Sequence, residues 1–142
     1  AIQVDAAFAP AHMNQASVLL HAGDYPAARA EYEAALRSDA ANVDARIGLA
    51  ISMRGQGQPQ DAKRELERVL EASAEHPAAL FDLAILRAEF LDQRPQSREL
   101  FQRFLDTGAA TAAQREVAER YLREIPAPAA PARRPGRQGG RS

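Results

Sequence analysis

A sequence repeat of 34 residues constrains this chain more than any other feature. Three segments, which begin at Gly23, Gly57 and Asp92, align at spacings of 34 and 35 residues. Each contains a small residue followed, four and eight residues later, by large apolar ones. These positions are Ala28, Tyr32 and Leu36, then Ala62, Leu66 and Leu70, then Ser97, Phe101 and Leu105. Such spacing gives an α-helix with one apolar face.

A second helix is predicted before each of these, since Ala16, Ala50 and Ala84 stand 34 residues apart. Small residues at such positions allow two helices to approach closely. Asp24 and Asn42 are expected to cap helix N-termini, and Thr111 begins a capping-box sequence. The pattern therefore predicts seven helices. Their expected spans are 10–22, 26–38, 43–55, 59–72, 77–91, 95–107 and 112–124.

Composition agrees with an all-helical chain and excludes several kinds of site. Hydrophobic residues make up 46% of the chain but aromatic ones only 6%, so the apolar content is mostly Ala and Leu, which favour helices. Without cysteine, neither disulfides nor thiolate metal sites can form. Residues 1–125 carry a net charge of −5, which does not favour nucleic-acid binding. Residues 126–142, a Pro/Arg/Gly tail with charge +4, are expected to be disordered.

The helix pairs resemble the tetratricopeptide repeat. The resemblance rests on Gly-Asp-Tyr at residues 23–25, the small residues of both helices, and aromatic residues at Tyr32 and Phe101. It implies an all-α, right-handed superhelix of helix-turn-helix repeats, with three repeats and a C-terminal capping helix. The family's aromatic residue early in the first helix is missing, because His12, Arg46 and Leu80 stand there. The expected units are 1–8 (remnant of an upstream repeat), 9–42, 43–76, 77–110, 111–125 (capping helix) and 126–142 (tail).

The first residues predict an array that continues upstream. Residues 1–6 align with residues 35–40, the end of a second helix. We therefore expect further repeats before residue 1, or self-association through the N-terminal face. The third repeat faintly resembles repeat proteins of bacterial envelope and motility machinery. The compartment stays open between the bacterial cytoplasm and the periplasm or envelope.

No catalytic constellation is predicted. His12, His21 and His76 have no partner at metal-ligand spacing. Ser17, His21 and Asp24 could be grouped as a catalytic triad, but no oxyanion donors or glycine-rich elbow accompany them. We therefore expect neither an enzyme, nor a cofactor, nor a small-molecule substrate.

The resemblance implies instead a concave groove, lined by the first helix of each repeat, that binds another protein or peptide. Carried over, the groove residues are Met13, Ser17, Leu20, Ile47, Ile51, Arg54, Phe81 and Ile85, with Ala88 completing the third row. Phe81 is the expected anchor, because it is the only aromatic residue in these rows. Some family members clamp a terminal carboxylate with Lys, Asn and Arg, which are replaced here by Met13, Ser17, Ile51, Ala78 and Asp82.

Two interpretations remain open at this stage. In the first, the chain is a protein-interaction scaffold whose apolar groove holds a partner helix or an apolar segment. In the second, the rows pack on one another and the chain is a structural spacer in a larger polypeptide, with no ligand of its own.

Overall fold

The computed structural model describes residues 5–128, and all regular secondary structure in that range is α-helix. The helices are α1 (Asp5–His21), α2 (Tyr25–Ser38), α3 (Val43–Gly55), α4 (Pro59–Ala72), α5 (Pro77–Glu89), α6 (Arg94–Asp106) and α7 (Ala112–Glu124). The prediction of an all-helical chain is confirmed there, and six of the seven predicted spans agree within two residues at each end. Most of the predicted tail, residues 129–142, lies outside the described residues.

The start of α1 is the exception, since the helix begins at Asp5 and not at residue 10. Residues 1–4 of the predicted upstream remnant lie outside the described residues, and residues 5–8 belong to α1. Pro10 lies inside α1, and the helix continues through it. A proline there removes only its own N–H, the donor for the Ala6 carbonyl, while the alanines before it favour helix.

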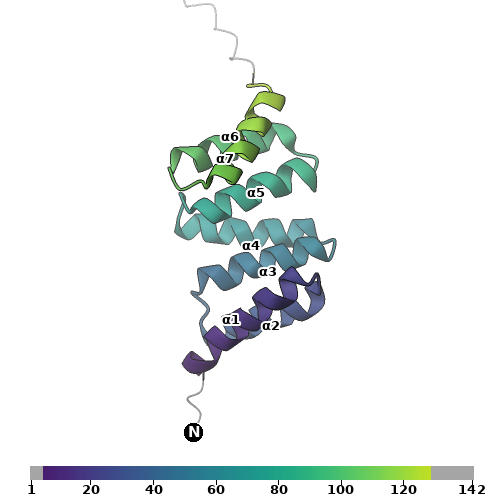
Figure 1. Cartoon of the computed structure of the whole chain (residues 1–142), viewed down its shortest axis with the longest axis vertical. Coiled ribbons are helices and arrows are strands. Elements are labelled where there is room, and N and C mark those ends of the chain that lie inside the picture. The colour runs from purple at the N-terminus through teal and green to yellow at the C-terminus, as the bar shows by residue number, and fades with distance from the viewer. Residues whose placement is uncertain (1–4, 129–142) are drawn as a thin grey trace, which may run out of the picture.

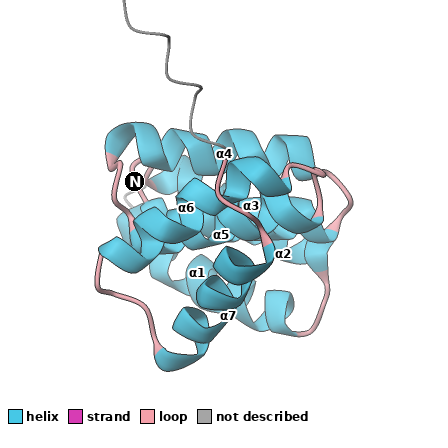
Figure 2. Cartoon of the chain, turned by 90° about the horizontal axis from the view of Figure 1, so that it is seen from above, coloured by secondary structure: helices cyan, strands magenta, loops and turns pink. Residues whose placement is uncertain are grey.

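The helices form an ordered stack in which each packs on the next along the chain (Figure 1). The stack rises from α1 and α2 at one end to α6 and α7 at the other. Seen along its length, short loops join the helices (Figure 2). Beyond these neighbour contacts, α1 contacts α3 and α3 contacts α5. The first helices of the three repeats therefore share one face, which we call the first-helix face.

The small residues of the repeat lie where helices cross. All six are at most 1% exposed; they are Ala16, Ala28, Ala50, Ala62, Ala84 and Ser97. The Ser97 hydroxyl donates to the Arg94 carbonyl at 2.7 Å, so its polar group is satisfied although buried. The large residues that follow, Tyr32, Leu66 and Phe101, are at most 5% exposed. The residues that recur in the sequence are therefore the ones through which the helices pack on one another.

The turns inside the first two repeats use glycine in a left-handed conformation, at Gly23 (φ 79°) and Gly57 (φ 78°). In the third repeat Asp92 takes this position with φ 54°. Aspartate tolerates this region better than most side chains. That turn spans residues 90–93, one residue more than the turns before it.

Side chains close the helix N-termini where the sequence predicted caps. Asp24 accepts the Ala27 N–H at 3.3 Å, and Asn42 accepts the Ala45 N–H at 3.0 Å. Thr111 and Gln114 form the predicted capping box. These bonds satisfy backbone donors that the helices themselves leave free.

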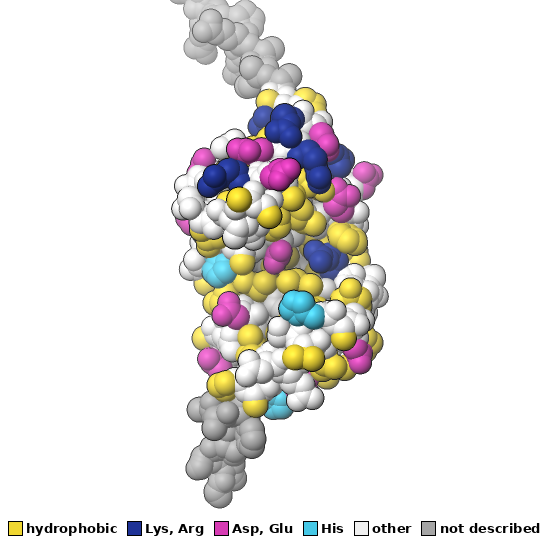
Figure 3. Space-filling model, in the orientation of Figure 1, with side chains coloured by type: hydrophobic (Ala, Val, Ile, Leu, Met, Phe, Trp, Pro, Cys, Tyr) yellow, Lys and Arg dark blue, Asp and Glu magenta, His cyan; other side chains and the backbone are white. Residues whose placement is uncertain are grey.

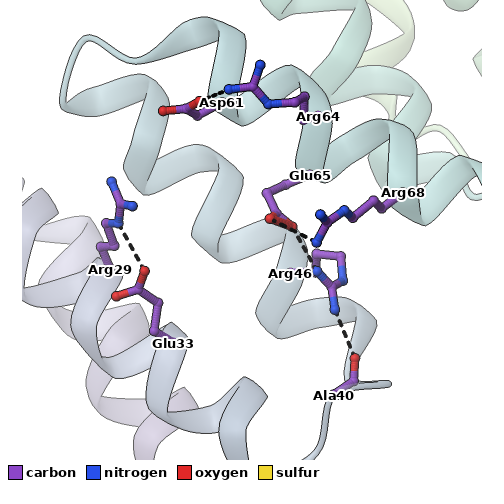
Figure 4. Close-up of polar contacts among 8 residues, drawn as sticks. All are labelled: Arg29, Glu33, Ala40, Arg46, Asp61, Arg64, Glu65 and Arg68. Carbon is purple, nitrogen blue, oxygen red and sulfur yellow. Dashed lines mark hydrogen bonds and ion pairs between the residues drawn. The ribbon is translucent and has the colours of Figure 1, made fainter.

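Polar pairs occupy the position where the resemblance would place an aromatic residue. Arg46 of α3 donates to Glu65 of α4 at 2.8 Å and to the Ala40 carbonyl at 3.0 Å, as Figure 4 shows. In the first repeat, His12 and Glu31 lie 2.5 Å apart across α1 and α2. The two helices of each of these repeats are therefore joined by a charged or polar pair instead of a ring.

Gly48 is enclosed in the middle of α3 by the ring of Tyr32. A Cβ on Gly48 would lie 2.3 Å from the ring carbons of this tyrosine, which is 5% exposed. We expect Gly48→Ala to lower the free energy of unfolding by about 1–3 kcal/mol through overpacking, although alanine favours a helix by about 1 kcal/mol over glycine. Urea unfolding measures the change. A Tyr32→Leu background should relieve most of it, and equal losses in both backgrounds would contradict this explanation.

Candidate functional site

Hydrophobic side chains gather across the middle of the first-helix face, over α1, α3 and α5, with only scattered charged ones among them (Figure 3). Two open hollows lie along the seam between α1 and α3. The first hollow is lined by residues near the N-terminal ends of α1 and α3, among them Met13 and Asp44. The second is lined by residues near their C-terminal ends, among them Leu20 and Arg54. The two helices therefore run in the same direction. We call the surface that joins the two hollows the α1–α3 groove.

The hollow at the C-terminal ends has a volume of about 410 Å³ and an aromatic lining; we call it the aromatic hollow. Its lining residues are Leu20, Tyr25, Ile51, Arg54, Gly55 and Phe90. Three of them, Leu20, Ile51 and Arg54, were predicted groove residues. This is the place where the structure brings predicted groove residues of different repeats together.

Phe90 is an exposed aromatic side chain of this face, with 48% of its surface in contact with solvent. The Arg54 guanidinium lies 5.3 Å from the centre of its ring, in cation–π geometry. The carboxylate of Asp82 compensates part of the positive charge of Arg54, which lines the aromatic hollow together with Phe90. Together Phe90 and Arg54 offer a partner an aromatic surface next to a positive charge.

The hollow at the N-terminal ends is larger, about 590 Å³, and carries acidic residues; we call it the acidic hollow. Its lining residues are Pro10, Met13, Asn14, Ser38, Asp39, Asn42 and Asp44. Met13 is a predicted groove residue, and it lies here apart from the others. Asp39 accepts the Ala41 N–H at 3.1 Å, whereas Asp44 is exposed in the first turn of α3.

Asp82 lies between α3 and α5, in a narrow gap whose other lining residues are Ala50, Ile51, Arg54, Ala62, Leu66 and Leu86. The side chain is half-buried there. Burial raises the pKa of Asp82 to about 6, and the positive charge of Arg54 opposes the rise. The ionised form of Asp82 is therefore less favourable, relative to its neutral form, in the folded protein than in water.

In the third row of the predicted groove, Phe81 and Ile85 are half-buried. The Phe81 ring lies 4.9 Å from the Phe104 ring and 6.2 Å from the Phe101 ring of α6, and Ile85 packs against the core. Neither residue lines the two hollows. Ile47 was expected to be partly exposed, and this was wrong, because it is 7% exposed. Ala88 is likewise buried. Ser17, in contrast, is only partly buried on α1.

Phe90 and Tyr25 line the aromatic hollow but were not among the predicted groove residues. Phe90 follows α5 at the repeat position that holds Ala22 and Gln56 in the first two repeats. An aromatic residue at a helix end, where its counterparts are small or polar, was the available signal. Tyr25 was used only for the turn pattern, and its ring reaches the aromatic hollow because Gly55 leaves room for it.

Other kinds of site find little support in residues 5–128. No group of three or more His, Cys, Asp or Glu side chains there is arranged to hold a metal ion. None of the helices in this range has the length and apolar character needed to cross a membrane.

Comparisons with known proteins agree with the helix pairs. Two family models of the tetratricopeptide repeat match residues 13–53 and 43–68. No curated protein gives a significant match to the sequence. The crystal structure of the Sgt2 tetratricopeptide-repeat domain from Aspergillus fumigatus is similar, with a TM-score of 0.72 and 17% identity over 92% of this chain and 93% of that one. At this identity the likeness concerns the fold.

Proposed function

We propose that this chain, which carries tetratricopeptide repeats and folds as a solenoid of them, is a protein-interaction scaffold that holds a partner helix in its α1–α3 groove. Protein binding is the general role of such repeats, and the likeness to a tetratricopeptide-repeat domain agrees with it. The proposal includes no catalytic step and no small-molecule substrate. The similarity of the third repeat to bacterial envelope and motility proteins is supported by no comparison and stays a prediction.

The observation that carries this proposal is the aromatic hollow. Phe90 exposes 48% of its surface beside Leu20 and Ile51, which come from two other repeats. An aromatic residue at the edge of a preformed hollow, next to an arginine, has the composition of a binding hot spot. The apolar residues of α1 and α3 extend this surface along the groove, as a partner helix would require.

A structural spacer remains the second candidate, and a specific observation favours it. Of the predicted groove residues, Ile47 is buried in the core and Phe81 is half-buried against Phe104. If the remaining groove residues also served only to join repeats, the chain would need no partner. Mutating the exposed Phe90 and the half-buried Phe81 decides between the scaffold and the spacer.

The test is affinity purification with the full chain, followed by measurement of the dissociation constant for the recovered protein. We expect Phe90→Ala to weaken binding about 30-fold, as removal of a hot-spot residue does. Val18→Ala is the matched control, because Val18 is 69% exposed on α1 and does not line either hollow. Both variants should melt like the wild type.

Phe81→Ala completes the comparison, because it was the anchor expected from the sequence. Its contacts with Phe104 and Phe101 predict early melting and, in the folded fraction, nearly normal binding. If Phe90→Ala and Val18→Ala bind the recovered protein equally well, the aromatic hollow is not the binding site. The spacer interpretation would then replace the scaffold.

A further inference from the structure

The α1–α3 groove has opposite charges at its two ends. Asp39 and Asp44 line the acidic hollow, and Arg54 is the charged residue in the lining of the aromatic hollow. Asp44 and Arg54 both belong to α3, ten residues apart, which corresponds to about 15 Å along a helix. The groove is therefore polarised along its length, with Ile51 between its charged ends.

The charged residues and Ile51 point to the same side of α3. At 100° per residue, Asp44 and Ile51 differ by about 20° around the helix axis, and Arg54 lies about 60° further round. On α1, Met13 and Leu20 lie seven residues apart and so share one side in the same way. A single straight ligand can therefore contact both charged ends and the apolar residues between them.

We propose that this groove binds its partner helix in one direction, antiparallel to α1 and α3, with acidic residues near the partner's N-terminus at Arg54 and basic residues near its C-terminus at Asp44. This proposal rests on the proposed function and adds the orientation and charge pattern of the ligand. Charge complementarity at both ends selects this direction.

Helix physics favours the same direction. Helices commonly carry acidic residues in their first turn and basic residues in their last, because these complement the helix dipole. α3 itself follows this rule, with Asp44 in its first turn and Arg54 in its last. A partner helix with the same ordinary pattern meets opposite charges only when it runs antiparallel to α3. In the parallel direction its acidic end would face Asp44 and its basic end Arg54.

Asp82 reduces this polarity at one end. It lies beside Arg54 in the narrow gap between α3 and α5, where its negative charge offsets part of the positive charge of the guanidinium. Replacing Asp82 with asparagine should therefore strengthen the preference for an acidic group at that end. This variant tests the role of Arg54 without changing a residue of the aromatic hollow.

The test uses two synthetic 14-residue amphipathic peptides of identical composition, blocked at both ends and labelled with fluorescein. One carries two Glu near its N-terminus and two Arg near its C-terminus, and the other has these charges exchanged. Fluorescence polarisation gives both dissociation constants. We expect the wild type to bind the first peptide about five- to tenfold more tightly at low salt, since several partly exposed charge pairs change together.

The double variant Asp44→Arg/Arg54→Glu should reverse the preference. This comparison cancels any difference in helicity between the free peptides, because each peptide is measured against both proteins. Asp82→Asn should enlarge the wild-type preference, and 0.5 M NaCl should reduce it. Circular dichroism should show that all variants fold.

The outcomes separate this proposal from the function on which it rests. If both peptides bind equally and Phe90→Ala weakens both, the groove binds helices without a fixed direction, so the polarity proposal is wrong and the scaffold stands. If Phe90→Ala changes neither affinity, or neither peptide binds at millimolar concentration, the groove does not hold a helix of this kind and this proposal falls. Loss of the natural partner's binding in Phe90→Ala would still support the scaffold.

Discussion

Phe101→Ala is expected to lower the free energy of unfolding by about 3–5 kcal/mol, which is the usual cost of truncating a fully buried phenylalanine. Phe101 of α6 is 0% exposed. Its ring stacks on Tyr121 of α7 at 4.6 Å and meets the edge of Phe81 of α5 at 6.2 Å. The truncation therefore weakens both junctions of α6 at once. Urea unfolding, followed by circular dichroism, measures the loss.

Phe90→Ala is the matched control, because it makes the same chemical change on an exposed residue in the same repeat. It should change stability by less than about 1 kcal/mol. Equal midpoints of urea unfolding for the two variants would mean that the ring contacts of Phe101 with Phe81 and Tyr121 do not hold the C-terminal half together. If Phe101→Ala loses about half of the unfolding free energy of a typical domain, these ring contacts do stabilise that half.

Asp82→Asn is expected to stabilise the protein at neutral pH by about 1–2 kcal/mol. The pKa of Asp82 is raised from 3.8 to about 6, which corresponds to about 3 kcal/mol at most, and partial contact with solvent reduces this value. A carboxyl group whose pKa is raised by folding favours the folded state most below its unfolded pKa, near 4. That contribution is lost as the pH rises through 6. Asparagine has almost the same shape and carries no charge.

The difference in stability between Asp82→Asn and the wild type should therefore be largest at pH 7–8 and disappear near pH 4. Denaturant unfolding at a series of pH values tests this. Glu99→Gln, which removes an exposed carboxylate from α6, should show no such dependence. A stability difference that is independent of pH would mean that burial of the Asp82 charge is not the cause.

Most of the fold was predictable because repetition supplied three copies of the same local signals. The buried alanines of both helices, the turn glycines and the N-caps recur in phase, so one ambiguous copy was corrected by the others. α1 shows where this failed. The helix start was predicted at residue 10, whereas α1 begins at Asp5. The third-repeat turn, in contrast, was aligned correctly although Asp92 replaces glycine.

The candidate site was less predictable, because helical spacing tells which side of a helix a residue faces but not how deep it lies. Ile47 and Ile51 are one turn apart, yet Ile47 is buried and Ile51 lines the aromatic hollow. Phe81 was expected to face a ligand; it is half-buried, and its ring lies near both phenylalanines of α6. Phe90 is exposed directly after the end of α5, at a position where the other two repeats have Ala22 and Gln56. How deeply each of these residues is buried depends on contacts between repeats, and the sequence pattern of one repeat does not predict those contacts.

Substantial contacts in the stack join only helices that are one or two places apart along the chain. Folding therefore never has to wait for distant parts of the chain to meet, and little chain entropy is lost before the first favourable contacts form. Each helix pair can act as a nucleus from which order spreads to its neighbours. We expect refolding within milliseconds, at a rate set by pairing within one repeat and not by the length of the array.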